Sequence, residues 1–316
     1  MLIRLIKNWT LPLAMLVGTL CYFVFAKVPL LAPAKPCIDG LIALLTPALI
    51  FAQLLLTFCR IEVRELKPKR WHGWLLLFQT ASCLLVAGLA CLPMEETYRG
   101  VLEGAMVCLI CPTATSAAVI TAKLGGSAAS LTTYTLLSNL LAATVVPLLF
   151  PMVEPHAGIG FFAAFSKILG RVFPLLLLPF LLACLLRAYV PRLHRLLSGW
   201  RDAAFYLWGV ALAIVSGQTV RSLVHNDAPV WVEVLIALVG LVACCVQFYL
   251  GKSIGGHYRE RISGGQALGQ KNTVLAIWMA YTYLHPLSSV APGSYVLWQN
   301  VINSWQLWKK RKREGT

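Results

Sequence analysis

The sequence predicts an all-α polytopic membrane protein with ten transmembrane helices. Of its 316 residues, 59% are hydrophobic and only 12% are charged, whereas soluble globular domains carry about 25% charged residues. Apolar stretches of about twenty residues, the length that crosses a bilayer as a helix, recur along the chain. Charged and turn-forming residues divide these stretches into ten expected helices, over residues 10–28, 38–58, 71–92, 99–123, 126–151, 166–188, 202–220, 228–250, 264–284 and 287–308.

The ends of the expected helices follow from charged residues and prolines. Arg4 and Lys7 precede the first apolar stretch as in a signal peptide, but no small-residue cleavage site follows it. We therefore expect an uncleaved first helix. The first two helices are separated by Pro29, Pro33 and Pro36, and two further prolines, at positions 151 and 155, end the fifth.

Basic residues predict the orientation of the chain. With ten crossings, twenty lysines and arginines fall on the side that carries both termini, and six fall on the other side. Because cytoplasmic loops are enriched in Lys and Arg, we expect both termini in the cytoplasm and the protein in a cytoplasmic (inner) membrane of bacterial type. The basic tail, residues 309–316, is expected to contact anionic membrane lipids. The net charge of +15 is dispersed between the spans, so we expect no nucleic-acid partner.

Ten crossings divide into two halves of five, residues 1–155 and 156–308. An odd-numbered unit that is repeated once places its second copy upside down in the membrane, so the pattern predicts two inverted five-helix repeats. The fourth and ninth helices, which are the fourth member of each half, are both interrupted in mid-span by polar, helix-breaking residues. Matching interruptions of this kind are the best sequence indicator of a secondary transporter's binding site.

The first interruption comprises residues 111–116. Pro112 lacks a backbone donor and disfavours helical geometry at Cys111, while Thr113, Thr115 and Ser116 can cap the half-helix that follows. The start of such a half-helix presents free N–H groups and the positive end of a helix dipole, which favours an anion such as a carboxylate. A simple proline kink is the alternative, and the matching second interruption favours a site.

The second interruption comprises residues 269–273. Gly269 permits a break, Gln270 follows it, and Asn272 and Thr273 can cap the next half-helix. Lys271 is the exceptional residue, because a lysine at the centre of a span costs ~3 kcal/mol or more. It should therefore face a cavity or a partner, unless it reaches the membrane surface along its own side chain.

No catalytic or metal-binding pattern is evident, so we expect neither an enzyme nor a cofactor. Cys108 and Cys111 form a C-x-x-C without a second ligand pair, and we expect the ten scattered cysteines to be small buried hydrophobes. Glu103 could pair with a cation, but it lies one turn from Arg99 and is expected near the membrane surface. Membrane amides most often bond between helices, and the candidates here are Asn139, Gln218, Gln247, Asn300 and Asn303.

Three groups of residues carry a resemblance to a known family. They are Cys111-Pro112 followed by small and hydroxyl residues, the run from Gly269 to Ala276, and His285-Pro286-Leu287 with the Trp298-Gln299-Asn300 region. Over essentially the whole chain, the sequence resembles the bile acid:sodium symporter family. The resemblance implies ten helices in two inverted repeats, with helices 4 and 9 unwinding and crossing beside the substrate and sodium sites.

The chain departs from that family's sodium-coupled members at the residues that bind sodium. Those members have a Ser-Asn pair where this chain has Ala117 and Ala118, and an E-x-G-x-Q-N pattern in which Ala267 and Lys271 replace the Glu and Gln. The resemblance therefore implies that the sodium site is lost. The lysine resembles that of the family's sodium-site-deficient branch.

The sequence thus predicts a secondary transporter that carries a small organic anion by alternating access, with Lys271 as a fixed cation in place of sodium. The lysine could hold the crossing together, pair with the substrate, or titrate and couple transport to protons. The alternatives are a sodium-coupled symporter with a rearranged ion site, an intramembrane enzyme acting on a lipid-linked substrate, and a receptor or scaffold. Substrate identity, direction and oligomeric state stay open at this point.

Overall fold

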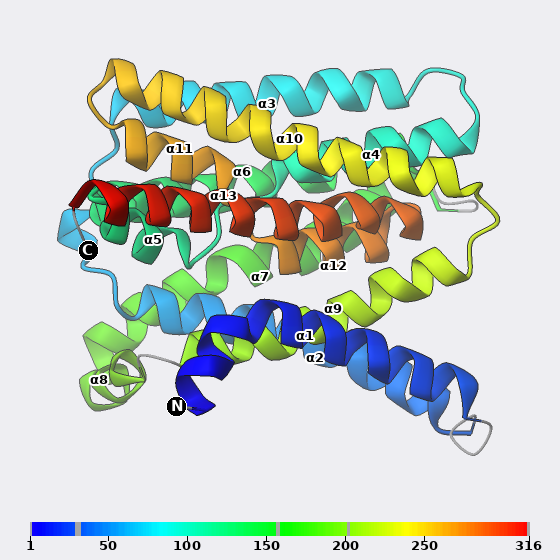
Figure 1. Cartoon of the computed structure of the whole chain (residues 1–316), viewed down its shortest axis with the longest axis horizontal. Coiled ribbons are helices and arrows are strands. Elements are labelled where there is room, and N and C mark those ends of the chain that lie inside the picture. The colour runs from blue at the N-terminus through cyan, green and yellow to red at the C-terminus, as the bar shows by residue number, and fades with distance from the viewer. Residues whose placement is uncertain (1, 29–32, 156–158, 201–202, 315–316) are drawn as a thin grey trace. The chain divides into compact units, whose positions relative to one another are not determined.

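The computed structural model describes residues 2–28, 33–155, 159–200 and 203–314, and within these residues the chain is helical and contains no strand (Figure 1). Two short 3-10 turns, η2 (Val63–Glu65) and η3 (Pro286–Ser289), accompany the α-helices. The α-helices are α1 (Leu2–Lys27), α2 (Lys35–Phe58), α3 (Arg70–Ala90), α4 (Glu96–Ile110), α5 (Ala117–Leu124), α6 (Ala128–Val153), α7 (Phe161–Tyr189), α8 (Pro191–Gly199), α9 (Ala203–Val224), α10 (Val230–His257), α11 (Arg261–Gly269), α12 (Thr273–Tyr283) and α13 (Val290–Glu314).

The helices coincide with the expected spans. Six of them, α2, α3, α6, α7, α9 and α10, are long and apolar enough to cross a membrane. The fourth expected span is divided into α4 and α5, and the ninth into α11 and α12, which confirms that both helices are broken at the expected places. The total of ten crossings stays a prediction.

The helix α8 is an addition to the expected elements. The sequence of this segment reads as a charged loop, but Pro191 occupies the first turn of a helix, where a missing N–H costs nothing. None of the α8 side chains is buried within the protein.

The chain forms two compact units. The first consists of Met1–Arg60 and Leu178–Asp227, and the second of Ile61–Leu177 and Ala228–Thr316. This division differs from the expected halves, residues 1–155 and 156–308, because compactness groups neighbouring helices whereas a repeat is defined by symmetry. Both broken helices lie entirely in the second unit.

In the first unit, α1 and α2 both pack against α9. A Cβ atom on Gly18 of α1 would lie 2.0 Å from the carbonyl oxygen of Ala213, so α1 and α9 are in backbone contact. Arg221 on α9 also forms an ion pair with Asp39 on α2 at 2.9 Å. Small residues of this kind let membrane helices approach closely.

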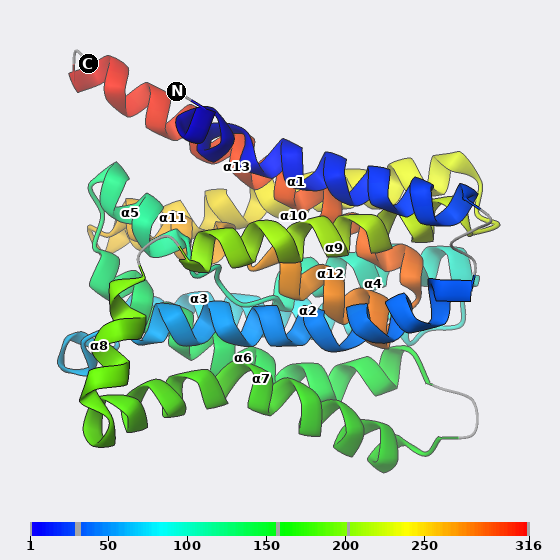
Figure 2. The ribbon, with the colours of Figure 1, turned by 90° about the horizontal axis from the view of Figure 1, so that it is seen from below.

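In the second unit, α10 and α11 are in backbone contact as well. A Cβ atom on Gly264 of α11 would lie 2.4 Å from the carbonyl oxygen of Gly251 and 2.8 Å from the Cα of Gly255, both on α10. In Figures 1 and 2, α5 and α11 lie toward one end of this unit and α4 and α12 toward the other. The two breaks therefore lie between these pairs of half-helices, within the interior of the unit.

Candidate functional site

The first break follows from Pro112. The helix α4 ends at Ile110, and Cys111 adopts a non-helical backbone (φ −52°, ψ 134°), as expected of a residue before proline. The chain then runs without helical structure to Ser116, the N-cap of α5. At its other end, α5 terminates at Gly125, whose φ of 92° is in the left-handed region that glycine adopts without strain.

The second break lies between Gly269, the last residue of α11, and Thr273, the first of α12. Gln270 has an extended backbone (φ −97°, ψ 95°). The side chain of Asn272 accepts a hydrogen bond from the N–H of Leu275 at 3.3 Å, so the expected cap of α12 is confirmed.

The two breaks cross and pair with each other. Thr113 and Lys271 form an isolated antiparallel bridge. On either side of it, the N–H of Ala114 donates to the carbonyl of Gln270 at 2.8 Å, and the N–H of Asn272 donates to the carbonyl of Pro112 at 2.9 Å. Each unwound segment thus satisfies backbone groups of the other, which a membrane interior requires.

The side chains of the two bridge residues, Thr113 and Lys271, also bond to the end of the opposite helix. In continuous helices, the N–H groups of Thr113 and Lys271 would bond to the carbonyls four residues earlier, those of Leu109 and Ala267. Instead, Thr113 Oγ1 donates to the Ala267 carbonyl at 2.6 Å, and Lys271 Nζ donates to the Leu109 carbonyl at 3.1 Å. Each break therefore supplies the side-chain donor that the other helix end lacks.

The displaced N–H groups find partners on two further helices. The N–H of Thr113 donates to Ser138 Oγ on α6 at 3.2 Å, and the N–H of Lys271 donates to Gln299 Oε1 on α13 at 2.9 Å. Neither Ser138 nor Gln299 was among the predicted site residues. Gln299 lies in the region that carries the family resemblance, whereas the signal for Ser138 is a polar side chain within an apolar stretch.

The last carbonyls of α4 are satisfied by side chains from α3 and α10. Gln79 Nε2 donates to the carbonyls of Ile110 (2.8 Å) and Cys111 (3.1 Å), and Gln247 Nε2 donates to that of Cys108 (3.1 Å). With the ammonium of Lys271 on Leu109, all four terminal carbonyls have donors. Of these two glutamines, only Gln247 was a candidate from the sequence, and it bonds between helices as expected.

Two tyrosines complete the frame, by which we mean the side chains of neighbouring helices that bond around the crossing: Gln79, Tyr134, Ser138, Gln247, Tyr295 and Gln299. Tyr134 on α6 donates to Gln79 Oε1 at 3.1 Å, and Tyr295 on α13 donates to the carbonyl of Gly269 at 2.7 Å. Gln247 Nε2 also donates to the Tyr295 hydroxyl at 3.3 Å. Both tyrosines are fully buried, so these bonds fix the ends of α4 and α11 in a dry environment.

Lys271 lies where two negative helix ends meet. Its side chain is 1% exposed, and the ion pairs found among the described residues all involve other cations. The C-terminal ends of α4 and α11 each carry roughly half a negative charge, so together they offset about one positive charge. The expectation that this lysine faces a partner is confirmed, and the partner is a helix end.

The remaining predicted site residues divide into buried and accessible ones. Cys111, Pro112, Gln270, Asn272 and Thr273 are buried at the crossing, where Cys111 Sγ donates to the Asn272 carbonyl at 3.0 Å. All five therefore lie where the two breaks meet, and binding by them stays a prediction.

Thr115 is half-buried and Ser116 is exposed, so this end of the first break is accessible. The prediction that Thr113, Thr115 or Ser116 caps the half-helix is wrong, because the N-cap of α5 is Ser116 without a side-chain cap bond and the Thr113 hydroxyl bonds to Ala267. Ser116 has a helical backbone (φ −72°, ψ −15°), from which its side chain does not cap. Its Oγ instead accepts a hydrogen bond from Gln270 Nε2 at 3.0 Å, because the second break brings that amide within reach.

Gly269, the last residue of α11, is needed for space, since a Cβ atom there would lie 2.4 Å from the Phe248 ring.

Glu103 is fully buried within the protein, and its Oε2 accepts a hydrogen bond from the N–H of His285 at 3.0 Å. Its expected place near the membrane surface stays a prediction. The turn between α12 and η3 covers Glu103, a long-range contact that the local sequence does not indicate.

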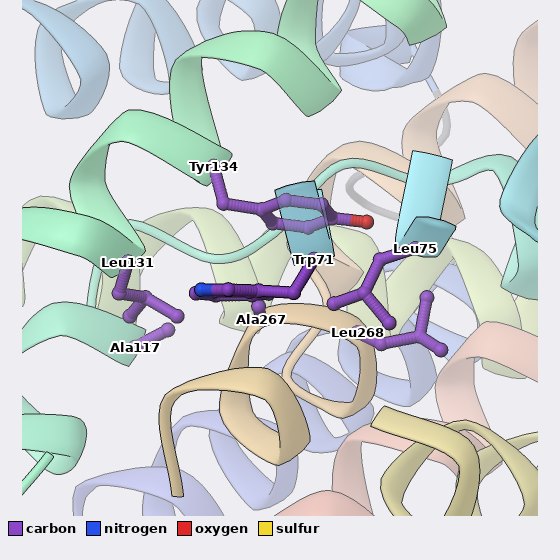
Figure 3. Packing of buried hydrophobic residues seen from close by; sticks show 7 residues of the cluster. All are labelled: Trp71, Leu75, Ala117, Leu131, Tyr134, Ala267 and Leu268. Carbon is purple, nitrogen blue, oxygen red and sulfur yellow. The ribbon is translucent and has the colours of Figure 1, made fainter. Parts of the chain in front are cut away.

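A hydrophobic cluster fills the space beside the crossing (Figure 3). Ala117 at the start of α5 and Ala267 near the end of α11 are fully buried in it, against Trp71, Leu131 and Tyr134. The Trp71 and Tyr134 rings are stacked with their centroids 6.1 Å apart, as the parallel rings in Figure 3 show. Among the described residues, no group of three or more His, Cys, Asp or Glu side chains could hold a metal ion.

A comparison with protein families identifies one match. The model of the SBF-like CPA transporter family matches residues 13–299, which is most of the chain and includes both breaks. A search of the curated proteins found none that matches the chain.

Proposed function

Because the chain belongs to the SBF-like CPA transporter family, it is a multi-pass membrane transporter, and we propose that it carries a small organic anion by secondary active, alternating-access transport. The observation that carries the proposal is the crossing of two broken helices, with a buried lysine at the crossing. Rocking of the crossover core, which contains both broken helices, against the remaining helices would expose the crossing to one side of the membrane and then to the other.

We also propose that the chain consists of two inverted five-helix repeats. The contacts at the crossing support this, because they occur in corresponding pairs. Thr113 and Lys271 make equivalent side-chain bonds to the opposite helix end. The fifth helix of each half supplies a tyrosine and, four residues later, the acceptor for the bridge residue's N–H: Tyr134 and Ser138 on α6, Tyr295 and Gln299 on α13.

For Lys271, the role of a fixed cation has the strongest support. Its ammonium bonds to the Leu109 carbonyl and is shielded from solvent, which favours holding the crossing together over direct contact with a substrate. The loss of sodium coupling is supported by Ala117 and Ala267. These positions, where the sodium-coupled relatives of the bile acid:sodium symporter family carry Ser and Glu, are part of the dry cluster in Figure 3.

We assign the anion to the accessible end of the first break, residues 114–116. Ala114 and Thr115 are half-buried and Ser116 is exposed, immediately before the first turn of α5. The positive dipole end of α5 and the hydroxyls of Thr115 and Ser116 suit a carboxylate, sulfate or similar group. Since Lys271 offsets the opposite, negative helix ends, this end keeps a net positive potential.

The orientation follows from the charge asymmetry between the loops. We propose that both termini are cytoplasmic, in a bacterial-type inner membrane, and that the end of α13 contacts anionic lipid. In that helix, Lys309 lies over the Trp305 ring and Lys312 over the Trp308 ring, at 4.9 Å and 5.4 Å from the centroids. Aromatic and basic residues combined in this way are typical of a membrane surface.

The test is a transport assay on the purified protein in proteoliposomes, with a panel of carboxylates and organic sulfates in sodium-free and sodium-containing buffers. We expect saturable uptake of at least one anion without sodium. Ser116→Ala should weaken it, whereas Ser198→Ala, which removes a hydroxyl that bonds to the Arg195 carbonyl within α8, should not. Uptake that requires sodium would refute the coupling proposal and favour a rearranged ion site. The absence of uptake for every anion, with a neutral or cationic solute carried instead, would refute the substrate class.

A further inference from the structure

The short helix α8 runs across the direction of its neighbour α2. Both helices belong to the first compact unit, and they pack against each other. The helix α2 extends lengthwise in Figures 1 and 2, whereas α8 is seen nearly end-on in Figure 1 and upright in Figure 2. Since α2 is long and apolar enough to cross a membrane, a helix that lies across it runs along the membrane surface.

The side chains of α8 form an apolar face and a basic face. Leu193, Leu196 and Trp200, the C-cap residue, are spaced by three and four residues and therefore lie on one side of the helix. They are 40%, 54% and 51% exposed. Arg192 and Arg195 lie on the other side and are exposed as well. The helix is thus amphipathic, but its apolar face is turned away from the protein.

Both ends of α8 are held in place. At its start, the N–H of Val190 donates to the carbonyl of Leu186 at 3.0 Å, so α8 follows directly on the last turn of α7. At its end, the guanidinium of Arg60, just after α2, donates to the carbonyl of Trp200. The exposure of the two leucines is therefore fixed by the fold, and these side chains gain no hydrophobic stabilisation within the described protein.

We propose that α8 is a binding site for anionic phospholipid at the surface of the membrane. Leu193 and Leu196 would lie among the acyl chains, and Arg192 and Arg195 would contact the lipid phosphates, whose geometry the guanidinium group matches. Trp200, at the end of the helix, belongs to the residue type that is enriched at the level of the headgroups. The charge of the basic face selects anionic over zwitterionic lipid.

This contact is separate from that of the basic tail. The helix α8 belongs to the first compact unit and the end of α13 to the second, so each unit has its own contact with the lipid surface. With both termini cytoplasmic, as proposed above, α8 lies at the cytoplasmic leaflet. The inference rests on the chain being a membrane protein, as its family is, and not on the transported anion or on Lys271.

A photoreactive side chain tests the position of α8 in the whole protein. Benzoylphenylalanine replaces Leu196 in one variant and Arg195, on the opposite face, in a second. Both are reconstituted in nanodiscs with equal amounts of phosphatidylcholine and phosphatidylglycerol, illuminated and examined by mass spectrometry. We expect phospholipid adducts at position 196 and far fewer at position 195. Equal yields, or no lipid adduct at position 196, would overturn the proposal. Crosslinks from position 196 to a second copy of the chain in place of lipid would also overturn it.

The adducts at position 196 also report the headgroup. An arginine near an anionic surface contributes about fivefold to binding, so the ratio of phosphatidylglycerol to phosphatidylcholine adducts should exceed the bilayer ratio, by up to about 25-fold for two arginines. Arg192→Gln combined with Arg195→Gln should abolish this excess. The control, Arg64→Gln combined with Lys67→Gln, removes the same charge from exposed positions between α2 and α3 and should keep it.

Two results would overturn the recognition of anionic lipid by α8. One is an adduct ratio equal to that of the bilayer when both arginines are present. The other is an equal fall in the two double variants, because this would show a general attraction by positive charge and not a site on α8.

Discussion

Thr113→Val most directly tests the side-chain bonds across the crossing, because it removes the hydroxyl that bonds to the Ala267 carbonyl. Valine keeps the shape of threonine and removes only the hydroxyl, whose oxygen donates to the Ala267 carbonyl at 2.6 Å in a site that is 1% exposed. The carbonyl cannot recover its helical donor, because the N–H of Lys271 is bonded to Gln299. A buried acceptor that loses its donor costs about 1–3 kcal/mol, so we expect the free energy of unfolding to fall by that amount.

The chain offers a matched control in Thr121→Val. Thr121 is also fully buried in the second unit, on α5, but its hydroxyl has no hydrogen-bond partner among the described residues. Removing it should leave stability unchanged or raise it, because a buried unpaired hydroxyl is itself unfavourable. Thermal or denaturant unfolding of the purified variants in detergent measures both. Equal losses in the two variants, or a Thr113→Val variant as stable as wild type, would refute the reasoning.

Three further predictions concern packing and charge. Ala267→Glu should destabilise the protein by several kcal/mol, because it buries a carboxylate in the apolar cluster. Ala122→Glu, on the exposed face of α5, should be nearly neutral. Similar melting temperatures for the two variants would contradict this prediction. Gly264→Ala should lower the free energy of unfolding by about 1–3 kcal/mol, because its Cβ atom would clash with the backbone of α10. Gly256→Ala, whose Cβ atom would have its nearest neighbours at 3.8 Å, should be tolerated. Thermal unfolding of the two variants measures the difference. Partial burial would raise the pKa of Glu260, but hydrogen bonds from Lys69 and Ser263 outweigh it and lower the pKa below its ordinary value. Its contribution to stability should therefore be present above pH ~4.3 and be lost as the pH falls below that, and Glu260→Gln should show no such loss between pH 3 and 6.

The positions of both breaks could be predicted from the sequence because their causes are local. Pro112 removes a donor, and a run of polar residues with a glycine interrupts the ninth span. The cap by Asn272 follows from the same local chemistry and is confirmed. The predicted cap by Ser116 is wrong, because Ser116 has a helical backbone instead of the extended one from which a side chain caps, and its hydroxyl accepts from Gln270, 154 residues away in sequence.

The frame around the crossing could not be predicted, because it depends on contacts between distant segments. Gln79 and Tyr134 look like single polar residues in apolar spans, and only the fold brings them together at the end of α4. The same is true of Glu103, which the turn at His285 covers. At these positions the polar residue has a partner, and only the three-dimensional arrangement identifies it.

The central claim is that Lys271 takes the place of a bound sodium ion. The most direct measurement is the melting temperature of the purified protein as sodium replaces potassium at constant ionic strength, for wild type and Lys271→Gln. A site that binds sodium would raise stability by about 2.7 kcal/mol at a concentration one hundred times its dissociation constant. The account predicts no sodium-specific change in wild type and a lower melting temperature for Lys271→Gln, since the Leu109 carbonyl loses its charged donor. A sodium-specific stabilisation of wild type would contradict it.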